Sequence, residues 1–203
     1  MNPLNTVLGT IIGGFVLAIA IAAGIGGFDV STLHIDRWLH IVAGVLWIGL
    51  LYYFNFVQVP ALADAVADTE GPGGGGITKY VAPRALLWFR WAALVTWLTG
   101  AYYLWAAGGG SNLHNTFTLG LMSDPMSQYH LIIGIGAWMG TIMLFNVWVL
   151  IWPNQKKVLG LVEASDDEKN KAKRIAFLAS RTNTFLSIPM LMCMGGAPHG
   201  LPF

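Results

Sequence analysis

Residues 40–55 read HIVAGVLWIGLLYYFN, an apolar run that begins with an imidazole and ends with an amide. Ninety residues later, residues 130–146 read HLIIGIGAWMGTIMLFN. Both stretches follow the order His, three residues, Gly, Trp-x-Gly, five residues and Asn, with one extra residue before the second Trp. Two histidines at matching places in two apolar helices predict a pair of ligands to one metal or haem iron.

The bulk composition indicates a membrane protein. Of the 203 residues, 55% are apolar and only 10% are charged, whereas a soluble domain carries about 25% charged residues. A net charge of +1 gives no indication of nucleic-acid binding. Cys193 is the only cysteine, which excludes an internal disulfide, a cysteine zinc cluster, an iron–sulfur site and the Cys-x-x-Cys-His attachment of c-type haem.

The apolar runs predict one all-α integral-membrane domain, residues 1–203, with about five transmembrane helices. The last of these is short and contains Pro189, and a surface helix over 166–180 is expected to lead into it, capped by Ser165 with Glu168. The helices before Pro60 and Pro153 are expected to end there. The predicted spans are 8–27, 37–57, 85–106, 129–152 and 184–198.

Charge asymmetry predicts the orientation. With five crossings, ten of the eleven lysines and arginines fall on the side of the N-terminus, and only Arg37 falls on the other. The positive-inside rule makes the basic side cytoplasmic and places the histidines toward the opposite side.

The repeat of 37–106 and 129–198 predicts a pseudo-symmetric four-helix bundle that holds b-type haem, plus one N-terminal helix. His40 and His130 are the expected axial ligands, with Gly44 and Gly134 one turn further along to let the macrocycle edge approach. Helix packing is the other interpretation of both pairs. His199 is either a tail residue or part of a second ligand set, so the number of haems is one or two. Trp47 and Trp138 are predicted as pocket walls, with core or interface packing as the alternative.

A second polar group is expected nearer the basic side. Arg90, Asn55 and Asn146 are candidates for holding a small anionic substrate, and the alternative for Arg90 is that it extends to the membrane interface. No carboxylate lies inside a predicted span, so no catalytic residue is predicted.

Three stretches carry a resemblance to the integral-membrane domain of bacterial cytochrome-c-linked urate hydroxylases, also called membrane urate oxidases. They are WLH at 38–40 with WIGLLYYFNFVQ at 47–58, WPNQKK at 152–157, and ASRTNT at 179–184 with SIPM at 187–190. A weaker likeness extends to haem-containing membrane protoporphyrinogen oxidases and to copper-resistance membrane proteins. The resemblance implies an oxidoreductase of the bacterial inner membrane that hydroxylates urate to 5-hydroxyisourate and passes electrons to cytochrome c.

The chain departs from that family by stopping at Phe203 without a fused c-type cytochrome. Electrons are therefore expected to leave to a separate cytochrome c or a terminal oxidase. Two other functions stay open: a non-catalytic accessory subunit, with or without haem, of a respiratory or photosynthetic membrane complex, and a copper-handling or other metal-handling protein.

Overall fold

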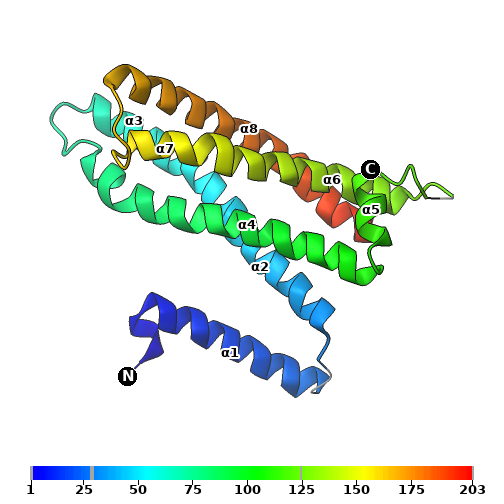
Figure 1. Ribbon diagram of the computed structural model, residues 1–203. Helices are drawn as coiled ribbons and strands as arrows, with labels where there is room; N and C mark the ends of the chain where they lie inside the picture. Colours follow the sequence, from blue (N-terminus) through cyan, green and yellow to red (C-terminus); the bar gives the residue numbers. More distant parts are fainter. Residues whose placement is uncertain (1, 28–29, 124, 203) are drawn as a thin grey trace. The chain divides into compact units, whose positions relative to one another are not determined.

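The computed structural model describes residues 2–27, 30–123 and 125–202, and the regular structure over these residues is helical. The chain divides into two compact units, Met1–Thr32 and Leu33–Phe203. The first unit consists of a short 3₁₀ turn, Pro3–Asn5, and helix α1, Val7–Gly26 (Figure 1). Thr6 caps α1 by accepting a hydrogen bond from the backbone N–H of Gly9, and α1 buries none of its side chains.

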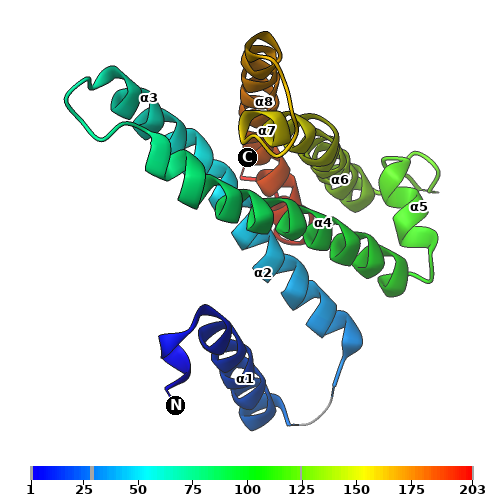
Figure 2. The ribbon, with the colours of Figure 1, turned by 60° about the vertical axis from the view of Figure 1, so that its left-hand side comes forward.

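The second unit is a set of long helices that run alongside one another, joined by short turns (Figures 1 and 2). Three π-helical segments, η2, η3 and η4, interrupt or precede these helices. The elements in chain order are α2 (Thr32–Tyr52), η2 (Tyr53–Gln58), α3 (Val59–Ala67), η3 (Ile77–Val81), α4 (Ala82–Ala107), α5 (Ser111–Phe117), α6 (Gln128–Phe145), η4 (Asn146–Ile151), α7 (Trp152–Val158) and α8 (Asp166–His199).

Three continuous helices are long and apolar enough to cross a membrane. They are α1, the α2–η2–α3 helix from Thr32 to Ala67, and the α6–η4–α7 helix from Gln128 to Val158. Length and composition thus support a membrane protein over the described part of the chain.

Each π-helical segment ends two residues before a proline. The last π-type hydrogen bonds join the N–H of Val59 to the carbonyl of Phe54 and the N–H of Trp152 to the carbonyl of Val147. A proline inside an α-helix lacks an N–H and clashes with the carbonyl four residues earlier, and a wider turn removes that carbonyl from its path. The expectation that the helices end before Pro60 and Pro153 is therefore wrong, because both continue, to Ala67 and Val158.

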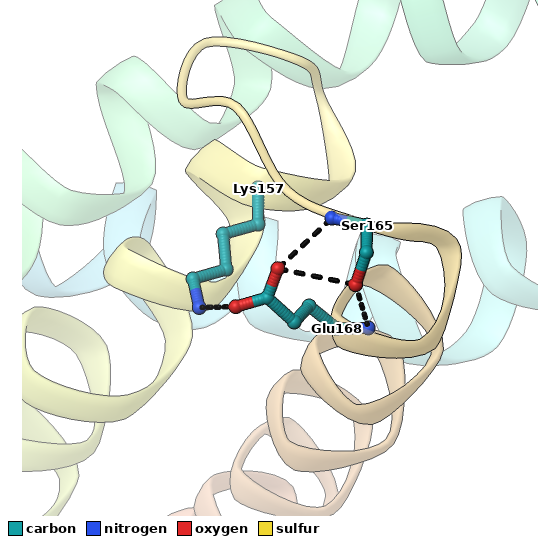
Figure 3. A network of polar contacts seen from close by, with 3 residues as sticks. All are labelled: Lys157, Ser165 and Glu168. Atoms are coloured by element: carbon teal, nitrogen blue, oxygen red, sulfur yellow. Dashed lines mark hydrogen bonds and ion pairs between the residues drawn. The ribbon is translucent and has the colours of Figure 1, made fainter.

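Helix α8 is one element of 34 residues. The predicted surface helix over 166–180 and the predicted short span over 184–198 are its two halves, and Pro189 lies inside it. The predicted capping box at its start is confirmed: Ser165 accepts from the N–H of Glu168, and the Glu168 carboxylate accepts from the N–H of Ser165 at 2.9 Å (Figure 3). Lys157, at the end of α7, adds an ion pair to Glu168 at 3.6 Å.

The core of the second unit lies where α6 and α8 pack against each other and meet α2 and α4. Leu51, Met143 and Ala93 are fully buried there. Small residues let α6 and α8 approach closely: a Cβ added to Gly136 would come within 3.1 Å of the Cβ of Cys193. Close approach through small side chains is the usual way in which membrane helices pack.

Candidate functional site

His40 lies against helix α4. Its Nδ1 atom is 2.8 Å from the carbonyl oxygen of Thr96 and 3.4 Å from the hydroxyl of Thr99. Gly100 makes room for the ring, because a Cβ at that position would lie 2.8 Å from Cε1 and 3.0 Å from Nδ1 of His40. A glycine on α4 and a carbonyl one turn before it therefore hold the imidazole in place.

The hydrogen bond to Thr96 fixes the tautomer of His40. A carbonyl oxygen only accepts, so Nδ1 carries the proton and the neutral ring keeps a lone pair on Nε2. Metal-binding histidines commonly donate their other ring N–H to a backbone carbonyl, which orients the ligand nitrogen and raises its basicity. His40 fits a haem or metal ligand in this respect.

His130 lies against the short helix α5 and the turn that follows it. Its Nε2 atom is 3.3 Å from the side-chain oxygen of Asn112 on α5. Its Nδ1 atom is buried and has no hydrogen-bond partner among the residues that the structure describes. With Asn112 as acceptor, Nε2 carries the proton, so the open lone pair of His130 is on Nδ1. His130 therefore has an unsatisfied buried acceptor, and its Nε2 becomes a ligand only when Asn112 releases it.

The glycines one turn along from the histidines have different neighbours. A Cβ on Gly44 would meet the Thr96 methyl at 3.6 Å, an ordinary contact. Gly134 faces the backbone carbonyl of Thr116, which closes against it so tightly that any side chain would displace α5. In the structure Gly134 serves the packing of α5, and Gly44 contacts α4.

The two tryptophans of the repeat also differ. Trp47 is 2% exposed within the core, and its indole N–H has no hydrogen-bond partner in the described part of the chain. Trp138 is 45% exposed; its indole donates to the carbonyl of Phe117 at 3.1 Å, and the two rings meet edge to face. The core interpretation therefore describes Trp47, whereas Trp138 holds the end of α5.

Asn55 and Asn146 both hydrogen-bond to helix α8. The amide of Asn55 donates to the carbonyl of Leu51 and to the hydroxyl of Ser180, at 2.9 and 2.8 Å. The amide of Asn146 donates to the side-chain oxygen of Asn183 at 2.8 Å. Ser180 and Asn183 are three residues apart and so lie on one face of α8. The repeat thus places two equivalent amides, each in a π-helical segment, against neighbouring positions of one helix.

Arg90 has a different setting from the two asparagines. Its guanidinium carbon lies 3.8 Å from the centroid of the Trp152 ring, a cation–π contact between α4 and α7. Within the described residues no hydrogen bond joins Arg90 to Asn55 or Asn146, and Asn55 has both amide hydrogens engaged. The three predicted substrate residues thus have separate partners.

The remaining histidines are exposed. His34 lies in the first turn of α2, His114 on α5, and His199 is the last residue of α8. Across the described ranges, no three or more His, Cys, Asp or Glu side chains gather into a group able to hold a metal ion. Bis-imidazole haem needs only two protein ligands, so the absence of such groups of three among the described residues does not bear on a site built on two histidines.

Three residues that contact the predicted site residues were not themselves predicted as site residues: Gly100, Asn112 and Asn183. Gly100 stands among bulky aromatic residues of α4, and that contrast in size is a sequence feature that indicates a close approach. Asn183 belongs to the stretch ASRTNT, but no periodic pattern in the sequence predicts its buried hydrogen bond with Asn146. Asn112 lies between the predicted spans 85–106 and 129–152, where no helix was predicted.

The chain matches no curated protein and no solved structure. Residues 117–201, which contain α6, η4, α7 and α8, match the model of the urate oxidase N-terminal family.

Proposed function

We propose that this chain is a membrane oxidoreductase of urate hydroxylase type that binds haem b through His40 and His130. The observation that carries the proposal is the hydrogen bond from Nδ1 of His40 to the Thr96 carbonyl, which leaves Nε2 as an oriented lone pair. The buried, unpartnered ring nitrogen of His130 supports it, as does the family match over the segment that contains His130.

The proposed setting is the bacterial inner membrane, with five crossings and the basic loops on the cytoplasmic side. Supporting this, three helices are long and apolar enough to cross, and six of the basic side chains lie between Lys156 and Arg174 around the α7–α8 connection. The histidine ends of α2 and α6 then face the periplasm, where a separate cytochrome c is the proposed acceptor.

The proposed reaction oxidises urate and water to 5-hydroxyisourate, with release of two protons and two electrons. Bound haem would supply a one-electron carrier between the substrate and the acceptor. The protein's own contribution is to orient the imidazole: Thr96 fixes the tautomer of His40, and Gly100 lets its ring approach α4 closely. Buried core residues such as Trp47 keep water from the inner face of α2.

The test is the reduced-minus-oxidised spectrum and the pyridine haemochrome of the purified protein, compared with His40→Ala and His130→Ala. The expected result is a low-spin b-type spectrum that both variants lose. His114→Ala and His199→Ala are matched controls, because these histidines are exposed, and both should keep the spectrum. A colourless wild-type protein from haem-sufficient cells would overturn the proposal.

Reduction of the haem by urate in the isolated protein would support the enzyme over the accessory subunit. A b-type spectrum that urate leaves oxidised, in a protein that comigrates with an oxidase, would favour the accessory subunit.

A further inference from the structure

An apolar hollow of about 370 Å³ lies on the side of the bundle between α4 and the α6–η4 helix. Its walls are formed by Leu94, Trp97, Thr141, Leu144, Phe145 and Trp148. Three of these residues carry a polar group. The indole N–H of Trp97 donates to the Thr141 hydroxyl at 2.9 Å, and that hydroxyl donates to the carbonyl of Ala137. The indole N–H of Trp148 is buried and has no hydrogen-bond partner among the described residues. Because the Trp148 N–H is buried, the surface that the hollow presents is apolar, which suits an alkyl chain better than a polar heterocycle.

Two cations lie at one end of this hollow. Arg90 precedes Leu94 by one helical turn on α4, and Trp152 follows Trp148 by about one turn on the facing helix. Because the two helices run in opposite directions, both steps lead toward the same end, where Arg90 stacks on Trp152. Lys156 approaches the same ring, with its ammonium 5.9 Å from the centroid.

Among the described residues, neither Arg90 nor Lys156 forms an ion pair. Across the described residues the ion pairs are Lys157 with Glu168 and Lys169 with Asp166, and neither includes Arg90 or Lys156. An arginine stacked on an aromatic face keeps its in-plane N–H donors free at its edge, a geometry that suits bidentate binding of phosphate.

We propose that this hollow and its cationic end form a binding site for one anionic phospholipid, with an acyl chain along α4 and α6 and the phosphate at Arg90 and Lys156. The site lies at the basic end of the bundle, so the lipid belongs to the cytoplasmic leaflet. Basic pockets between helices on that side are a recurrent setting for acidic lipid headgroups. This inference rests on the membrane placement proposed above and is independent of haem.

The experiment uses the full chain, delipidated in detergent and titrated with phosphatidylglycerol, with phosphatidylcholine of the same chains, and with inorganic phosphate. Native mass spectrometry counts the bound lipid. We expect one phosphatidylglycerol to bind, with affinity falling about fivefold in Lys156→Gln and about 25-fold when Arg90→Gln is added. Lys171→Gln, which removes an exposed charge from α8, should bind like the wild type. Leu94→Trp, which fills the hollow, should weaken binding with both charges intact.

Three results would overturn the proposal. Equal binding of phosphatidylcholine would leave an apolar hollow with no headgroup selectivity. Competition by millimolar phosphate would show that the cations take a small anion only. If Lys156→Gln bound phosphatidylglycerol with wild-type affinity, Lys156 would not contribute to the headgroup site. This result would stand even if the Arg90 variant failed to fold. A colourless protein that still binds phosphatidylglycerol selectively would overturn the proposed function and leave the lipid site standing.

Discussion

The Nδ1 atom of His40 lies 2.8 Å from the carbonyl oxygen of Thr96, although the two residues are 56 positions apart in the chain. The same carbonyl also accepts from the hydroxyl of Thr99 at 3.1 Å. A neutral imidazole has one ring N–H. When that N–H donates to a backbone carbonyl, the other ring nitrogen, here Nε2, has a lone pair in a fixed direction. The contact therefore links the packing of α2 on α4 to the chemical state of the candidate ligand.

Gly100→Ala is expected to break the hydrogen bond between His40 and the Thr96 carbonyl. The new methyl would meet the His40 ring at 2.8 Å, so the ring must turn away and lose the Thr96 carbonyl. Overpacking together with a lost hydrogen bond should lower the free energy of unfolding by about 1–3 kcal/mol. The measurement is thermal unfolding in detergent, with the haem spectrum recorded alongside.

Gly49→Ala is the matched control for this change. Gly49 is an exposed helical glycine on α2 with no atom within 4 Å of an added Cβ. Alanine there should be neutral or stabilising by about 0.5–1 kcal/mol, because it restricts the unfolded chain. If both variants behave alike, the His40 contact does not determine stability.

Asn112→Ala tests the second histidine. Asn112 accepts from Nε2 of His130, the nitrogen that haem iron would need, so the amide competes with ligation. Removing it should tighten haem binding by about tenfold or less, the value of one modest hydrogen bond. Titration of the apo-protein with haemin gives the affinity. Weaker binding in Asn112→Ala would mean that the amide supports His130 as it ligates, through Nδ1 or a water.

The hydrophobic runs in the sequence predict where the helices lie, but they do not predict where the helices end. Proline normally marks an end, and the expectation failed at Pro60 and Pro153 because a π-helical turn precedes each. A π-turn depends on which carbonyls find partners in three dimensions, and no simple residue pattern specifies it. The capping box at Ser165 was predictable because all of its atoms lie within four residues.

The candidate site was likewise predictable from the sequence only in part. Both histidines and both asparagines stand out in the sequence because they repeat in apolar surroundings. Their partners come from other helices at distant positions: Thr96 for His40 and Asn183 for Asn146. The repeat also predicts equal environments for Trp47 and Trp138, and the structure gives one a core and the other a surface position. Trp138 contacts the end of helix α5, which lies between the predicted spans 85–106 and 129–152, and Trp47 has no such contact in the described structure.

Asn183→Ala is expected to be the most destabilising change on the inner half of α8. Asn183 is fully buried, donates to the carbonyl of Met143 at 3.0 Å and accepts from Asn146. Its loss leaves the buried amide of Asn146 without its acceptor and removes one of the two hydrogen bonds to the Met143 carbonyl, which keeps the backbone N–H of Asn146, at a cost of about 1–3 kcal/mol. A double-mutant cycle with Asn146→Ala should give a coupling of about 0.5–1.7 kcal/mol, the range for hydrogen bonds between membrane helices. A coupling of zero would mean that the two amides act independently.

The start of α8 is expected to carry a pH dependence. Hydrogen bonds from Ser165 and then the charge of Lys157 hold the pKa of Glu168 below its ordinary value. A carboxylate with a lowered pKa in the folded state stabilises that state above its unfolded pKa, near 4.3, and the contribution is lost as the pH falls through the folded value. Hydrogen exchange at the first turn of α8, followed from pH 6 to pH 3, should therefore quicken, beyond its intrinsic pH dependence, below about pH 4.5.

Glu168→Gln should remove this acid-dependent opening, because the amide has no charge to lose, and it should exchange faster than the wild type at pH 6. Asp167→Asn is the control, since Asp167 occupies the same first turn but is not the capping residue. It should keep the wild-type pH profile because the contact between α7 and α8 is intact. An acid-dependent opening that survives in Glu168→Gln but vanishes in Asp167→Asn would assign the pH dependence to the interaction of Asp167 with the helix dipole instead.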